Sequence, residues 1–114
     1  MKKSLLFLSF VLIISLSLQA TNPTHEFRAT WLTTGFGIDW PKTKNVELQK
    51  ESLCDILDVM AKGNMNAVCL QVRSFADAIY QSSYEPWSSI LTGTRGEDPG
   101  YDPLTFAIEE AHKR

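Results

Sequence analysis

The chain has 114 residues, of which 44% are hydrophobic and 11% are aromatic, and this composition excludes an intrinsically disordered protein. The formal net charge of −2 excludes a general nucleic-acid binder, which would carry a basic patch. Two cysteines are too few for a disulfide scaffold. The length is that of one small domain, or of part of a larger one.

Residues 1–20 have the pattern of a signal peptide. Two lysines precede an apolar run over residues 5–18, and Ala20 offers a small residue to a signal peptidase. The run is shorter than the roughly 20 residues that span a bilayer. We expect cleavage and export to a periplasmic or extracellular space, with no stable membrane span afterwards; the alternative is an uncleaved N-terminal anchor. Removing residues 1–20, which hold two lysines and no acidic residue, leaves 94 residues with a formal charge of −4.

A strand and a helix are the first predicted elements after the leader. Phe27–Leu32 is rich in aromatic and apolar residues, which is typical of a strand. In Val46–Lys62 the apolar residues recur at helical spacing, and the charged residues lie mainly off that stripe. Asn45 is placed to cap the start of this helix, and Gly63 is placed to end it.

A second strand and a second helix follow. Ala67–Val72 is an apolar run of strand length, and Asp102 with Pro103 begins a helix that continues to the end of the chain. The order β-α-β-α favours parallel strands with helices packed outside them. The two connections after the strands, Thr33–Lys44 and Arg73–Tyr101, are long, and ordered loops of that length are usually functional.

The two cysteines lie in the first helix and the second strand. Cys69 shares strand parity with Gln71 and Arg73, on the face opposite the helix-facing residues Val68, Leu70 and Val72. Cys54 belongs to the helix, so its side chain and that of Cys69 point in different directions. We expect two buried free thiols, with a disulfide as the alternative.

Candidate binding residues gather where the second strand ends. Ligands of open α/β sheets and of (β/α)8 barrels bind at the carboxyl ends of the strands, and Gln71 and Arg73 alternate there on one face. A half-buried arginine needs a carboxylate, a carbonyl or a ligand. Arg73 therefore either binds substrate or forms a structural pair with Asp77 or Glu85.

Aromatic residues of the two long loops allow two interpretations. Trp40 and Trp87 either stack on the apolar face of a sugar ring or cover the rim of the fold. Tyr80 and Tyr84 either line a groove or pack. Glycoside hydrolysis usually needs a pair of carboxyl groups, and nothing in the sequence selects such a pair among the loop carboxylates. Neither histidine has metal-ligand spacing, and phosphate-binding and nucleophile motifs are absent from the sequence.

A set of short motifs runs through nearly all of the chain after the leader. They are Glu26-Phe27-Arg28 with Trp31, Ile38-Asp39-Trp40-Pro41, Asn66-Ala67-Val68, Gln71-Val72-Arg73, Asp77-Ala78 with Tyr80, Glu85-Pro86-Trp87-Ser88, Leu91-Thr92-Gly93, Pro99-Gly100-Tyr101-Asp102-Pro103-Leu104, and Ala107-Ile108-Glu109-Glu110-Ala111-His112-Lys113-Arg114. Together they resemble the N-terminal part of the glycosyl-hydrolase-like family ten, bacterial exported proteins with a (β/α)8 barrel. The chain departs from the family pattern at Ser74, where proline is common, and at Ala29, where glycine is frequent.

The resemblance implies that residues 26–114 are the first two βα units of a (β/α)8 barrel, truncated at the C-terminus. It implies a glycoside hydrolase acting on a polysaccharide, with cell-wall glycan as a candidate substrate. From the residues themselves we expect no cofactor and no metal. The catalytic acids are then expected beyond Arg114, so this chain alone is expected to be inactive. The residues that we assign to substrate binding are Asp39, Trp40, Gln71, Arg73, Asp77, Tyr80, Glu85 and Trp87.

Two other interpretations stay open. One is a non-catalytic carbohydrate-binding or cell-surface protein on the same barrel. The other is a short protein that completes its sheet with another chain. The last helix reaches Arg114 with no glycine cap or return strand after it, and for this reason we favour a fragment of a larger domain.

Overall fold

The structure, a computed structural model, describes residues 26–114. The predicted signal peptide lies outside the described residues. Within residues 26–114, no helix combines the length and the apolar character needed to cross a membrane.

Two short parallel strands form the sheet. β1 (Ala29–Leu32) pairs with β2 (Ala67–Leu70), in a register that places Trp31 opposite Cys69. The parallel arrangement confirms the prediction, but both strands are shorter than predicted. Pairing stops at Leu32 because the chain then turns, and the next amide, that of Thr33, donates to the side chain of Asp39 instead.

The two long helices begin where the sequence predicts. α2 (Val46–Lys62) starts after Asn45, whose side chain accepts a hydrogen bond of 3.0 Å from the amide of Leu48. α4 (Pro103–His112) starts after Asp102, whose carboxylate accepts one of 2.9 Å from Thr105. These bonds satisfy amides that the first helical turn leaves without a partner. α4 ends at His112, two residues before the predicted end of the helix at Arg114.

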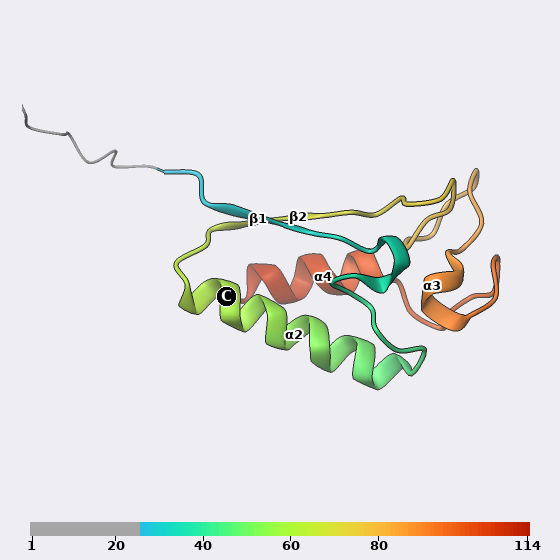
Figure 1. The fold of residues 1–114 in the computed structure, drawn as a ribbon, viewed down its shortest axis with the longest axis horizontal. Coiled ribbons are helices and arrows are strands. Elements are labelled where there is room, and N and C mark those ends of the chain that lie inside the picture. The colour runs from blue at the N-terminus through green and yellow to red at the C-terminus, as the bar shows by residue number, and fades with distance from the viewer. Residues whose placement is uncertain (1–25) are drawn as a thin grey trace, which may run out of the picture.

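Both helices lie on the same side of the strands (Figure 1). The core fills the space between them, and its buried apolar members are Leu32, Trp40, Leu53, Leu57, Ile79, Leu91 and Ala107. Val68, Leu70 and Val72 pack against this core, which confirms the predicted parity of the second strand. The opposite face of the sheet is left without a covering layer among residues 26–114.

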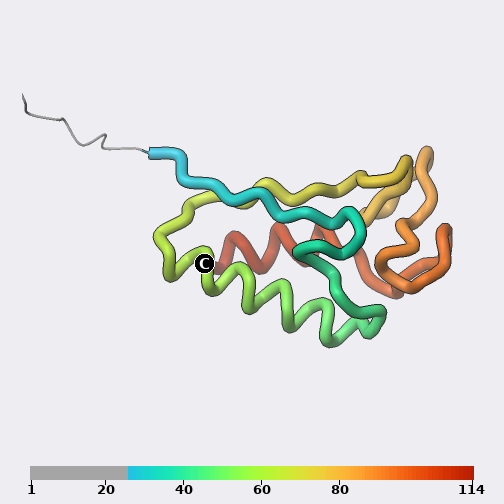
Figure 2. The backbone as a smooth tube through the Cα atoms, in the orientation of Figure 1, coloured from blue at the N-terminus to red at the C-terminus, as the bar shows by residue number. Residues whose placement is uncertain are grey.

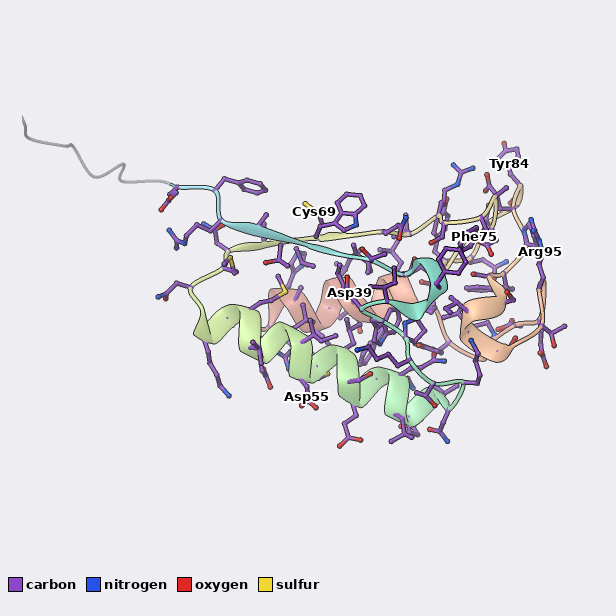
Figure 3. All side chains as sticks on the ribbon, viewed as in Figure 1. Asp39, Asp55, Cys69, Phe75, Tyr84 and Arg95 are labelled. Atoms are coloured by element: carbon purple, nitrogen blue, oxygen red, sulfur yellow. The ribbon has the colours of Figure 1, made fainter. Side chains whose placement is uncertain are left out.

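That uncovered face corrects one expectation. Cys69 is exposed and Cys54 is half-buried, and both are free. Figure 3 shows Cys69 on the side of the strands away from the helices. Trp31, its neighbour across the sheet, is 62% exposed. The prediction of two buried thiols is therefore wrong for Cys69, because the described residues place no layer over this face, and Cys54 is only partly buried. The disulfide alternative is contradicted as well, because both cysteines are free.

The two long loops lie together beyond the carboxyl ends of the strands (Figure 2). The first contains the short 3-10 turn η1 (Gly35–Gly37), and the second contains the short helix α3 (Ser89–Thr92). A single parallel bridge, Ala78 to Trp87, ties the second loop to itself. Both loops thus contain regular local structure, and they surround the strand ends where the sequence predicts a binding site.

Candidate functional site at the carboxyl ends of the strands

A polar cluster joins the two loops directly after the strands. The hydroxyl of Thr34, which is buried, donates to the main-chain oxygen of Gln71 at 2.8 Å and lies 2.7 Å from the hydroxyl of Ser74. Oε1 of Gln71 accepts hydrogen bonds of 3.0 Å from the amides of both Thr34 and Gly35. The side-chain amide of Gln71 is therefore held in one orientation by two backbone donors.

This orientation leaves one end of the Gln71 amide available. Among residues 26–114, Nε2 of Gln71 has no hydrogen-bond partner, and it is not a buried unsatisfied group. The nitrogen is thus a donor that is at least partly open to solvent, and its direction is set by the bonds that Oε1 accepts. A fixed amide donor at a strand end is suited to a hydroxyl or carbonyl oxygen of a ligand.

Arg73 forms an ion pair with Glu85. The second oxygen of Glu85 accepts a hydrogen bond of 2.7 Å from the hydroxyl of Ser82, so the carboxylate is held from two sides. The Glu85 side chain is 18% exposed, while that of Arg73 is 54% exposed. Of the two structural partners considered for Arg73, the structure selects Glu85, and about half of the Arg73 side chain remains open to solvent.

The other two predicted carboxylates hold turns. Asp39 accepts a hydrogen bond of 2.8 Å from the amide of Thr33 through Oδ2. Asp77 is buried and accepts one of 3.2 Å from the amide of Phe75. With Glu85 paired to Arg73, each of these three acids has a partner within its own loops or strand ends. These contacts make each of the three carboxylates a structural anchor.

Trp40 is not a sugar platform. Its ring is completely buried in the core, and Nε1 donates a hydrogen bond of 2.8 Å to the main-chain oxygen of Gln49. The stacking interpretation is wrong for this residue, because the loop folds back and covers the indole. Trp87 is half-buried and packs against the same core, which supports the interpretation that it covers the fold.

The two tyrosines differ in exposure. Tyr80 is half-buried, whereas Tyr84 is 94% exposed and lies at the tip of the second loop (Figure 3). The site residues predicted from sequence thus separate into two groups. Gln71 and Arg73 are accessible at the strand ends, whereas Trp40 and Asp77 are buried beneath the loops.

Gln49 is a positioning residue that the sequence analysis missed. It is completely buried on the core side of α2. Its Nε2 donates to the main-chain oxygens of Thr43 at 2.8 Å and Leu91 at 2.7 Å, and its Oε1 accepts from the hydroxyl of Tyr101 at 2.7 Å. The available signal was a glutamine four residues before Leu53, on the apolar stripe, since a polar side chain on a core face needs internal partners.

Burial shifts the titration of two groups in these loops. Burial first, and the charge of Glu47 second, raise the pKa of Tyr101 well above its usual range. Burial also lowers the pKa of Lys44, whose ammonium donates to the main-chain oxygen of Ile90 at 2.5 Å. Both groups tie loops to helices. Residues 26–114 hold no cluster of three or more side chains able to ligate a metal.

A pocket of about 770 Å³ lies at the other end of the strands. It is lined by the C-terminal half of α2, by β2, by α4 and by residues of the connection before β2, such as Asn64 and Asn66. Its walls include apolar side chains that the helices turn toward the sheet, among them Leu57 and Ala107. Ligands of parallel α/β folds bind at the opposite end, so we do not assign this pocket to substrate.

Known proteins provide an independent comparison for this arrangement. The family described as Glycosyl hydrolase-like 10 matches residues 26–114. Glycosyl hydrolase YngK of Bacillus subtilis (strain 168) is 46% identical over 113 residues, which cover 97% of this chain and 22% of that protein. Glycosyl hydrolase DigH of Escherichia coli (strain K12) is 38% identical over 100 residues, which cover 80% of this chain and 23% of that protein. The chain therefore spans less than a quarter of the length of these relatives, and the resemblance found in its motifs is confirmed: the chain belongs to the glycosyl hydrolase-like family 10.

Proposed function

We propose that residues 26–114 are the first two units of a (β/α)8 barrel. The parallel strands with both helices on one side support this. In a closed barrel, the face that carries Trp31 and Cys69 becomes the interior, and a third strand lies along the outer edge of β2. Side chains of that strand would fill the pocket beside β2, which accounts for its position and its apolar walls.

We further propose that the complete protein is a glycoside hydrolase that acts on a polysaccharide, with bacterial cell-wall glycan as the substrate class. The observation that carries this proposal is the pair of accessible donors at the strand ends, Nε2 of Gln71 and the guanidinium of Arg73, in a chain of this family. Sugar hydroxyls and carbonyls are acceptors for such groups. The leader pattern in residues 1–20 supports export, which would bring the protein to the cell wall.

The catalytic acids are proposed to come from later barrel units. Hydrolysis of a glycosidic bond usually needs two carboxyl groups on either side of it. The three predicted acids of this chain's loops, Asp39, Asp77 and Glu85, all hold structural contacts. In this proposal the present residues bind and position the glycan. The same observation favours one second candidate, a non-catalytic carbohydrate-binding protein on the same barrel.

Two measurements test these proposals. The coding sequence after Arg114 should encode further βα units with acidic residues at strand ends. A protein that includes those units should release soluble products from purified bacterial sacculi or shorten chitin oligosaccharides. Binding to these glycans without any hydrolysis would favour the non-catalytic candidate. Neither binding nor hydrolysis across a panel of glycans would contradict the proposed function.

A further inference from the structure

Two phenylalanines from different loops meet in solvent at the strand ends. Phe36 lies in η1 and is 82% exposed, and Phe75 follows β2 and is 47% exposed. Their ring centres are 4.8 Å apart, with an angle of 68° between the planes. Figure 3 shows Phe75 beside η1. An edge-to-face pair of this kind leaves ring faces uncovered on both residues.

The backbone around this pair is in a costly conformation. Phe36 has φ 55° and ψ 11°, and Ala76, the residue after Phe75, has φ 51°. A positive φ is uncommon for residues other than glycine, and for a bulky residue it is an outlier. Phe36 recovers little of that cost by burial, because most of its ring is in solvent. Strain of this kind is retained where the surrounding structure enforces it, and it concentrates at ligand sites.

Hydrogen bonds from neighbouring residues hold the backbone beside both phenylalanines in place. The turn before Phe36 is held by the bonds from Thr34 and Gly35 to Gln71. On the other loop, the buried carboxylate of Asp77 accepts the amide of Phe75.

Further contacts tie the second loop and join it to the first. Arg95 donates a hydrogen bond of 2.7 Å to the main-chain oxygen of Ala76, and the contact between the hydroxyls of Thr34 and Ser74 links the two loops. The ring pair is therefore pre-organised, and binding to it costs little ordering of the protein.

We propose that Phe36 and Phe75 form an aromatic platform that stacks on the apolar face of a sugar ring in the substrate glycan. The proposal rests on the proposed function. A glycan is the ligand that fits this site because Gln71 lies beside the ring pair. Its Oε1 holds the η1 turn that carries Phe36, and its Nε2 is a partly exposed donor at the same strand end. An aromatic surface for C–H groups beside a fixed donor for hydroxyls is a chemical match for a pyranose.

In this proposal Asp77, which the sequence predicts to bind substrate, acts on the ring pair and not on the glycan. Asp77 is buried and its carboxylate accepts the amide of Phe75, so it is a positioning residue for Phe75 and not a direct ligand of sugar. The platform also takes the place that the sequence analysis gave to Trp40, which is buried.

The experiment uses a protein that contains this chain and the following barrel units, with chitin hexasaccharide and purified sacculi as probes. The variants are Phe36→Gly, Phe75→Ala and Phe36→Trp. The matched control is Phe27→Ala, which removes a phenylalanine that is 76% exposed at the opposite end of β1. Glycine relieves a positive φ, so Phe36→Gly should keep or raise the melting temperature while it removes the ring.

We expect Phe36→Gly and Phe75→Ala to raise KM or Kd about five- to tenfold, the amount that one or two aromatic contacts contribute. kcat should change little, Phe36→Trp should restore the affinity, and Phe27→Ala should leave it unchanged. If the wild-type protein binds or hydrolyses these glycans, and Phe36→Gly and Phe75→Ala leave KM and Kd unaltered, the platform is overturned and the proposed function stands.

A large fall in melting temperature for Phe36→Gly would overturn the platform in another way, because it would show that later parts of the protein bury the pair. A wild-type protein without binding or hydrolysis would contradict the proposed function, and the platform with it.

Discussion

The hydroxyl of Tyr101 donates a hydrogen bond of 2.7 Å to Oε1 of Gln49, a side chain with no solvent exposure. Gln49 in turn donates to the main chain of both long loops, at Thr43 and at Leu91. One buried amide thus connects the start of α2 to the first loop, to the end of α3 and to the segment before α4. We therefore expect Gln49 to keep both loops in their positions around the strand ends.

Replacing Gln49 should therefore loosen the loops. In the protein that contains the following units, Gln49→Leu leaves two carbonyls and one hydroxyl without their partner, and buried unsatisfied groups cost about 1–3 kcal/mol each. Because these effects are not additive, we expect a loss of about 2–4 kcal/mol in the free energy of unfolding, measured with urea. Leu48→Ala, on the exposed side of the same helix, is the control and should lose much less.

Because of Tyr101, the free energy of unfolding should decrease at alkaline pH. Its pKa is raised in the folded state, chiefly by burial, so the folded protein holds the phenol proton more tightly than the unfolded chain does. Stability is then complete below the unfolded value of about 10 and falls as the pH rises above it. Urea midpoints between pH 8 and pH 11 should show this decline in the wild type and a weaker one in Tyr101→Phe. Tyr84→Phe, at an exposed tyrosine, should behave like the wild type; equal slopes in all three proteins would refute the assignment.

Residues 21–114 should not fold cooperatively by themselves. A two-stranded sheet is marginal, and here its face with Trp31 and Cys69 is exposed and its edge at β2 is open. Thermal melts followed by circular dichroism should be broad, with poorly dispersed amide resonances. Adding the barrel units that we propose to follow should produce a sharp transition. A sharp melt of the short monomer would contradict the barrel proposal.

The signal-peptide pattern of residues 1–20 predicts export and cleavage. Lys2, Lys3 and the apolar run up to Leu18 should direct export, and cleavage after Ala20 should leave Thr21 as the first residue. N-terminal sequencing of protein recovered from the periplasm or the medium checks this. An intact Met1 would show that the segment remains as an anchor.

The elements with local signals were predictable from sequence. Asn45 and Asp102 have the side chains that cap helices, and both caps are present in the structure. The alternation of Val68, Leu70 and Val72 gave the face that packs on the helices. These features depend on residues within one turn or one strand, so a single sequence contains them.

Features that depend on distant contacts were not predictable. Whether Trp40 lies on the surface or in the core depends on how its loop returns to Gln49, nine residues away. The exposure of Phe36 depends on a turn held by Gln71, which is separated by a whole helix. The partner of Arg73 is Glu85, chosen from two acids by the path of the second loop. Residue type and spacing do not specify such paths.

The central claim is that the strand ends of this chain contact the glycan, and Arg73 tests it. Arg73→Lys keeps the positive charge but loses the planar fork that suits paired acceptors. Arg73→Ala also leaves Glu85, whose side chain is 18% exposed, without its cationic partner. Arg28→Lys is the matched control, because Arg28 also pairs with a nearby acid, Glu26, but lies at the other end of β1.

The decisive measurement is kcat/KM on a glycan panel, with melting temperatures, for these variants in the protein that includes the following barrel units. We predict that Arg73→Lys lowers kcat/KM about tenfold, which corresponds to about 1.4 kcal/mol, with a nearly unchanged melting temperature, while Arg28→Lys changes neither. If both Arg73 variants lose stability and handle glycans as the wild type does, Arg73 serves only its ion pair with Glu85, and the site at the strand ends is contradicted.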